Sequence, residues 1–214
     1  MPVYKKITID QHTKVLIWKI EESVVTLSEG IELNQNSAER LAKMKSEVHQ
    51  KGFLSIRHLL KHLGYKDHDL YYNEHGKPHL KDGTEISITH SFEFTAVIVS
   101  NVKVGIDIEK QRDKIMKIAP KFTPIEEYTA LEGNDLIKKL TIVWGAKESL
   151  YKLYGKQGLL FLHDIFVTDF NLSENTTTAS VTSQGSKSFY DLSFLEFENY
   201  ICVYATENEK RNHQ

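Results

Sequence analysis

The chain of 214 residues is long enough to form one large domain or two small ones and to bury a sizeable core. Hydrophobic residues make up 40% and charged residues 26%, which is ordinary for a soluble globular protein. The net charge of −2 gives no global attraction to nucleic acid, and the apolar runs are too short for a signal sequence or a membrane span. We therefore expect a cytoplasmic protein that binds neither nucleic acid nor membrane.

The first half of the chain is expected to contain both strands and helices. Helix 53–63 would end at Gly64, and residues 38–66 hold seven basic side chains but only two acidic ones. This local charge suits a phosphorylated or acidic partner, although each lysine alone also fits a solvated helix face. The expected strands are 3–9, 15–20, 85–89, 95–100 and 102–108, the last three pairing antiparallel, and the expected helices are 38–50 and 53–63.

The second half repeats the order of helices followed by strands. Thr123 can cap a helix, with Pro124 at its first position and Glu126 completing a capping box. A long helix is predicted from about Asp135 to Tyr154. The remaining expected elements are a helix at 112–119 and strands at 160–170, 176–181, 188–194 and 200–206. Because helices precede strands in each half, we expect two similar α+β lobes that meet near residues 100–103.

Two carboxylates mark the strand Val104-Gly105-Ile106-Asp107-Ile108-Glu109. Its alternation puts Asp107 and Glu109 on one face, with Cα atoms about 6.5–7 Å apart. Neighbouring anions repel, and Mg²⁺ removes that cost when it is bound by carboxylates together with substrate phosphates. A solvated strand face is the alternative interpretation.

The long helix carries a second group of charges. Trp144, Glu148 and Lys152 fall four residues apart along one side. Lys147 lies within the apolar stripe, where a snorkelling lysine beside an ordinary Glu148–Lys152 pair is the alternative interpretation. Gly145 costs a helix on the order of 1 kcal/mol relative to alanine. Close approach by another element would explain this glycine.

The acidic strand and the pattern Trp144-x-x-Lys147-Glu148-x-x-x-Lys152 together resemble the 4′-phosphopantetheinyl transferase superfamily. Gly76-Lys77-Pro78 resembles its Gly-Lys-Pro element, and Thr89-His90-Ser91 resembles its Ser-His element, with Thr89 in place of serine. The chain length is similar to that of the two-lobed, surfactin-synthetase-activating branch. The resemblance implies an α+β fold of two similar lobes with pseudo-twofold symmetry, each a small, mainly antiparallel sheet packed with a long helix.

The resemblance also implies an activity. Such enzymes transfer the phosphopantetheine arm of coenzyme A, the co-substrate, to a serine of an apo acyl, peptidyl or aryl carrier protein and release 3′,5′-ADP. Asp107, Glu109 and Glu148 would ligate Mg²⁺. Lys147 and Lys152 would stabilise charge on the phosphates.

Further residues are assigned only by the resemblance. Glu127 would accept the serine proton, directly or through water. Arg57, Lys77, Thr89 and His90 would hold the nucleotide and its 3′-phosphate. The N-terminal lobe, residues 1–101, would then contact the nucleotide, and the C-terminal lobe, residues 102–206, would carry the Mg²⁺ site and the catalytic helix, followed by a polar tail at 207–214.

Two other functions are compatible with parts of the pattern. One is another Mg²⁺-dependent enzyme of phosphoryl chemistry, such as a nucleotide hydrolase, which would need no carrier protein. The other is a non-catalytic module that binds coenzyme A or a carrier protein, against which the intact set of Asp107, Glu109, Glu148 and Lys152 argues. The chain is expected to act as a monomer.

Overall fold

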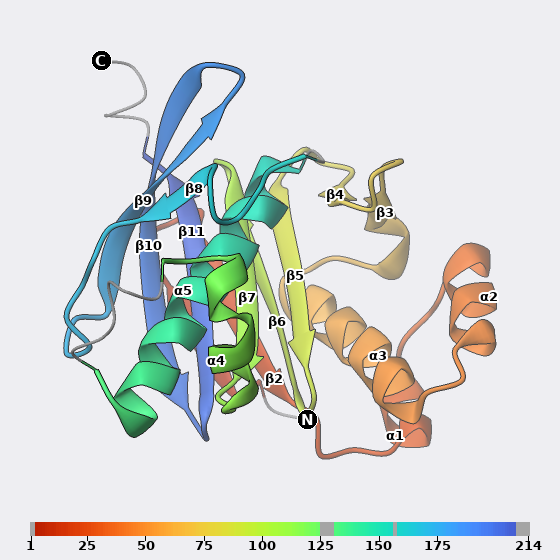
Figure 1. The fold of residues 1–214 in the computed structure, drawn as a ribbon. Helices are drawn as coiled ribbons and strands as arrows, with labels where there is room; N and C mark the ends of the chain where they lie inside the picture. The colour runs from red at the N-terminus through yellow and green to blue at the C-terminus, as the bar shows by residue number, and fades with distance from the viewer. Residues whose placement is uncertain (1–2, 125–130, 156–157, 209–214) are drawn as a thin grey trace. The chain divides into compact units, whose positions relative to one another are not determined.

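The computed structural model describes residues 3–124, 131–155 and 158–208 (Figure 1). The chain divides into two compact units, Met1–Asn101 and Val102–Gln214. Within the described ranges, no helix combines the length and the apolar character needed to cross a membrane.

The N-terminal unit is built on a four-stranded antiparallel sheet in the order β1-β2-β6-β5. Helix α3 packs on β2 and β6, and leucines along its length, among them Leu54, Leu59 and Leu60, enter the core with Trp18. The strands are β1 (Lys5–Thr8), β2 (Lys14–Lys19), β5 (Glu85–Ser91) and β6 (Phe94–Ser100), with a small hairpin of β3 (Leu70–Tyr72) and β4 (Pro78–Leu80). The helices are α1 (Val24–Ser28), α2 (Gln35–Lys43) and α3 (Glu47–His62), and a short 3₁₀ turn covers Asp67–Asp69.

The predicted break between two helices at Gly52 is wrong. The break lies at Met44, the C-cap of α2, and α3 runs through Gly52 without interruption. Asn34 caps α2 by accepting a hydrogen bond from the backbone N–H of Ser37. A buried helix tolerates glycine because its packing outweighs the weak intrinsic propensity of a single residue.

The C-terminal unit is a five-stranded antiparallel sheet in the order β7-β11-β10-β9-β8, with α5 against β7 and β11 (Figure 1). Leu140, Val143 and Leu150 of α5 enter its core. The strands are β7 (Val104–Lys110), β8 (Ile165–Val167), β9 (Thr176–Ser183), β10 (Ser186–Phe197) and β11 (Tyr200–Glu207). The helices are α4 (Lys114–Ile118) and α5 (Gly133–Tyr154), with a 3₁₀ turn at Ala119–Lys121.

Several local predictions for this unit are confirmed, and two are wrong. Helix α5 ends at Tyr154, and Gly155 takes the left-handed conformation of a C-cap, with φ +68°. Strand β7 pairs with β11 and not with β6, because a sheet partner is chosen by burial between distant segments. Only residues 165–167 of the expected strand 160–170 are a strand.

The fold class is confirmed as α+β, with an antiparallel sheet and a long packed helix in each unit. The helices in question are α3, with 16 residues, and α5, with 22. The pseudo-twofold relation between lobes concerns their arrangement and stays a prediction.

Candidate active site

The carboxylate strand β7 presents one face to helix α5. Gly105 lies against the backbone of Ser149, so closely that a Cβ on Gly105 would fall 1.9 Å from the Ser149 carbonyl oxygen. The next two residues on this face are Asp107 and Glu109, because side chains alternate along a strand. Both carboxylates therefore lie on the α5 side of the strand, as the alternation predicts.

Asp107 forms an ion pair with a lysine of α5. The Nζ of Lys152 lies 2.7 Å from Oδ1 of Asp107 and donates a second hydrogen bond, 3.0 Å long, to the carbonyl oxygen of Ile106. The Asp107 side chain is 7% exposed and that of Lys152 is 29% exposed. This lysine therefore neutralises a buried anion while it keeps contact with solvent.

Glu109 is bound by an indole. The Nε1–H of Trp144 donates a hydrogen bond of 3.1 Å to Oε1 of Glu109. The Trp144 ring packs edge-on against Phe122, with ring centroids 5.1 Å apart, and against Phe161 at 5.4 Å. This aromatic cluster therefore fixes the position of the indole N–H that donates to Glu109.

Burial and mutual repulsion perturb two of the carboxylates. Burial, and then the negative charge of Asp107, raise the pKa of Glu109 to about 7, while the Trp144 hydrogen bond and Lys152 act in the opposite direction. Burial and Asp107 also raise the pKa of Glu148, against the effect of Lys152. Three carboxylates and one ammonium therefore form a single electrostatic group with an excess of negative charge.

The three predicted metal ligands do not converge into a ready-made ligand set. Within the part of the chain that the structure describes, no three His, Cys, Asp or Glu side chains lie close enough to hold a metal ion. The assignment of Asp107, Glu109 and Glu148 as Mg²⁺ ligands stays a prediction. Repulsion between like charges favours separated carboxylates, and Lys152 holds Asp107 by one oxygen. The donor set still suits Mg²⁺, because all three groups are hard carboxylate oxygens.

Gly145 allows α5 to lie close to the sheet. A Cβ at this position would meet Cγ2 of Val203 at 2.9 Å and Oδ2 of Asp107 at 3.8 Å. Val203 is the β11 residue paired with Asp107. The close approach that the mid-helix glycine predicted is therefore present, and it occurs beside the carboxylate site.

Lys147 departs from its predicted role. Its ammonium is buried and donates to the carbonyl oxygens of Phe161 and Ile165. These bonds hold the segment after α5 in place, and the role of Lys147 at the phosphates, which the resemblance implied, stays a prediction that they do not favour. A buried ammonium needs its donors satisfied, and backbone carbonyls satisfy them here.

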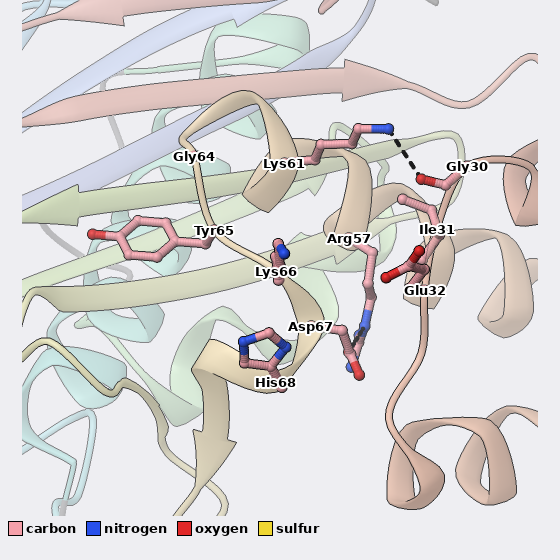
Figure 2. Close-up of a pocket in the computed structure, with 10 residues that line it drawn as sticks. All are labelled: Gly30, Ile31, Glu32, Arg57, Lys61, Gly64, Tyr65, Lys66, Asp67 and His68. Carbon is pink, nitrogen blue, oxygen red and sulfur yellow. Dashed lines mark hydrogen bonds and ion pairs between the residues drawn. The ribbon is translucent and has the colours of Figure 1, made fainter.

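Arg57 is likewise a structural residue of the N-terminal unit. Its Nε donates to Oδ1 of Asp67 at 2.9 Å, its Nη1 donates to the carbonyl oxygen of Phe53, and its guanidinium lies 3.4 Å from the Phe53 ring centroid. Figure 2 shows the Arg57 side chain turned toward Asp67. Its side chain is only 4% exposed, and its role at the 3′-phosphate stays a prediction that these contacts do not favour.

A pocket of about 540 Å³ lies beside Arg57 (Figure 2). Lys61 lines it but donates to the carbonyl oxygen of Gly30. The pocket borders the C-terminal end of α3, where the helix dipole is negative and disfavours phosphate. This pocket is therefore a poor substitute for the predicted nucleotide site.

The other predicted nucleotide residues lie along β5 and the hairpin before it. His90 is exposed near the C-terminal end of β5, with its ring over Gly52 of α3 and 6.0 Å from the His49 ring, whereas Thr89 is buried. The Nζ of Lys77 lies 3.9 Å from Oε2 of Glu85, the residue at the opposite end of β5 from His90. The structure therefore does not gather Lys77 and His90 at one point.

Two predicted residues lie in a part of the chain that the structure does not describe, and two features of the site were not predicted from the sequence. Glu127, the predicted base, lies outside the described residues, as does Glu126 of the capping box. Sequence reasoning missed the Trp144–Glu109 hydrogen bond and the role of Gly105. A glycine inside a strand often marks a close backbone approach, so Gly105 itself was the available signal.

Known proteins resemble this chain over the segment that carries these residues. Residues 103–205 match the family model described as the 4′-phosphopantetheinyl transferase superfamily. The chain is also 33% identical over 134 residues to the 4′-phosphopantetheinyl transferase gsp of Aneurinibacillus migulanus, an alignment that covers 61% of this chain. The alignment spans 54% of that relative, or about half its length. The unit that carries the carboxylate strand and the helix facing it is therefore similar to the 4′-phosphopantetheinyl transferase superfamily.

Proposed function

We propose that the protein transfers the 4′-phosphopantetheine arm of coenzyme A to a serine of an apo acyl, peptidyl or aryl carrier protein. The observation that carries the proposal is the group formed by Asp107, Glu109 and Glu148 with Lys152, inside the segment that matches the superfamily. Phosphoryl-type chemistry depends on charge neutralisation and alignment, which is what charged groups around one site provide.

In the proposed reaction the serine Oγ attacks the phosphorus that bears the pantetheine arm. A new P–O bond to serine forms, and the bond from phosphorus to the bridging oxygen breaks. The electron pair of that bond leaves with 3′,5′-ADP, and the serine proton passes to a base, for which Glu127 is the candidate.

Asp107, Glu109 and Glu148 would hold Mg²⁺. When bound, the ion supplies positive charge next to the pyrophosphate oxygens. The fit rests on the chemistry of the donors, which are three carboxylates; burial, and then the charge of Asp107, raise the pKa values of Glu109 and Glu148. Lys152, partly exposed beside Asp107, would contribute a second positive charge toward the phosphates.

The candidates for nucleotide contact in the N-terminal unit are Lys77, Thr89 and His90, of which Thr89 is buried and Lys77 lies at the other end of β5 from His90. His90 is the strongest of these candidates because it is exposed at a strand end. Arg57 is left out of this set, since its donors are engaged by Asp67 and Phe53.

The carrier protein would approach basic residues that border Glu109. A pocket of about 180 Å³ is lined by Glu109 and Trp144 together with Lys110, Arg112 and Lys114. These cations would attract an acidic helix on the carrier and raise the association rate more than the final affinity.

Intact-mass spectrometry tests the proposal. Apo carriers of the acyl, peptidyl and aryl classes are each incubated with the protein, coenzyme A and Mg²⁺. We expect one carrier class to gain the mass of one phosphopantetheine group, and Asp107→Ala to abolish the gain. Hydrolysis of free nucleotide without a mass gain would support a hydrolase instead, and coenzyme A binding with neither reaction would support a binding module.

A further inference from the structure

The carboxylate of Glu109 lies at the end of a flexible side chain, so a neighbour is needed to fix its position. A glutamate has three rotatable side-chain bonds, so its carboxylate samples several positions unless a neighbour fixes it. In this structure the Nε1–H of Trp144 donates to one oxygen, Oε1, at 3.1 Å. The donor comes from α5 and the acceptor from β7, so the bond joins the two elements of the site.

The indole itself is held on two sides. The fully buried Phe122 packs edge-on against it, and Phe161 packs at 5.4 Å. Lys147 binds the carbonyl oxygen of Phe161 and so fixes the backbone behind that ring. Packing therefore sets the direction of the indole N–H. Little side-chain entropy is then lost when Trp144 donates its hydrogen bond to Glu109.

The close approach at Gly145, the residue after Trp144, brings this donor within reach. A Cβ at Gly145 would meet Val203 at 2.9 Å and would push α5 away from the sheet that carries Glu109. Gly145, which allows the close approach, and Trp144, which donates the hydrogen bond, therefore act together from adjacent positions of the helix.

We propose that Trp144 is a positioning residue for Glu109, which it holds by Oε1 so that Oε2 is presented to the divalent ion. This inference rests on the proposed function, because it assumes that Glu109 is a metal ligand. Residues that hydrogen-bond to a metal ligand and orient it typically raise metal affinity by about 10- to 100-fold. Mere aromatic packing would not need the indole N–H.

Metal binding without turnover tests the proposal. Mn²⁺ is titrated into the whole protein, with and without coenzyme A, and free Mn²⁺ is measured by electron paramagnetic resonance. Trp144→Phe keeps an aromatic ring but removes the donor, and we expect Mn²⁺ affinity to fall about 10-fold. Replacement of Trp144 by benzothienylalanine, which keeps the bicyclic ring and exchanges N–H for sulfur, should give the same loss if Trp144→Phe disturbs the fold.

Two further variants separate positioning from packing. Tyr151→Phe alters the same aromatic cluster, since the Tyr151 and Phe161 ring centroids are 5.6 Å apart, and should leave Mn²⁺ affinity unchanged. In a Glu109→Gln background, Trp144→Phe should cause little further loss, because both changes act on one ligand. Unchanged Mn²⁺ affinity in both Trp144 variants would overturn the positioning role and leave the transferase intact. Failure of the unaltered protein to bind Mn²⁺ under either condition would overturn the metal site and the positioning role together.

Discussion

Two lysines of α5, five residues apart, are held in different environments. Lys147 is buried against the carbonyl oxygens of Phe161 and Ile165, whereas Lys152 is partly exposed beside Asp107. The same residue type thus supports the fold at one position and carries charge at the site at the other. The surroundings of each ammonium, more than its place in the motif, decide its role.

This difference predicts distinct mutant effects. Lys147→Met leaves two buried carbonyls without their donor and should lower the free energy of unfolding by about 1–3 kcal/mol, measured in urea. At temperatures where the variant stays folded, most of its turnover should remain. Lys152→Met, confirmed as folded by circular dichroism, should lose turnover by a factor on the order of 10²–10³. A stable but inactive Lys147→Met variant would contradict the structural assignment.

Glu109 links pH to stability in the metal-free protein. Its pKa is raised from 4.5 to about 7, chiefly by burial and by Asp107, so the folded state binds the proton more tightly than the unfolded state. Stability should therefore fall as pH rises from about 4.5 to about 7, and the full cost is present above that range. Glu109→Gln removes the charge and should stabilise the protein at pH 8 by on the order of 1–3 kcal/mol, with little effect near pH 4.

Glu196 provides the matched control for this measurement. Its pKa is lowered, first by the hydrogen bond from Lys138, so the charged form is favoured in the folded state. Glu196→Gln should therefore destabilise slightly at pH 8, the opposite sign to Glu109→Gln. Urea unfolding with a chelator present gives both values, and equal effects for the two variants at pH 8 would refute the assigned environment of Glu109.

At the scale of elements, the contact between β7 and α5 brings the candidate site residues together. Gly105 lies against the Ser149 backbone, and the Ser149 hydroxyl donates to the carbonyl oxygens of Gly145 and Val203. These contacts join α5, β7 and β11 at one layer of the core. The spacing between Asp107, Glu109 and Glu148 depends on this layer.

Gly105→Ala tests this contact. A Cβ placed 1.9 Å from the Ser149 carbonyl oxygen forces β7 and α5 apart, because both partners are backbone. Overpacking of this kind should lower the free energy of unfolding by about 1–3 kcal/mol or more. Turnover should fall as well, since the strand that carries Asp107 would move.

Gly52→Ala is the control for the glycine substitution itself. The nearest atom to its added Cβ is Cδ2 of His90 at 3.5 Å, an ordinary contact. Alanine should stabilise α3 by roughly 0.5–1 kcal/mol. If both variants shift the urea midpoint equally, the close contact at Gly105 is not specific.

Local signals in the sequence predicted most elements but not their partners. The alternation of β7 and the end of α5 at Tyr154 depend on nearby residues, and both are confirmed. The pairing of β7 with β11 and the continuation of α3 through Gly52 depend on burial against distant segments. No periodicity in the sequence contains that information.

The site shows the same division. The pattern of Asp107, Glu109, Glu148 and Lys152 selected residues that interact electrostatically in the structure. The family resemblance also pointed to Lys147 and Arg57. Their burial and their backbone or carboxylate partners could not be read from residue type. Spacing identifies which side chains share a face, whereas the fold decides which of them keep free access to a ligand.

For the whole molecule, the central claim is that coenzyme A cleavage requires a carrier protein. A hydrolase with the same carboxylates would act on the nucleotide alone, whereas a transferase needs the carrier serine as its nucleophile. The ratio of 3′,5′-ADP released to carrier modified therefore distinguishes the two directly.

The most direct measurement quantifies 3′,5′-ADP by chromatography and holo carrier by intact mass in one reaction with coenzyme A and Mg²⁺. We predict one 3′,5′-ADP per carrier modified and none above background when the carrier is omitted or its serine is replaced by alanine. Release of 3′,5′-ADP at the same rate without any carrier would contradict the proposed transfer.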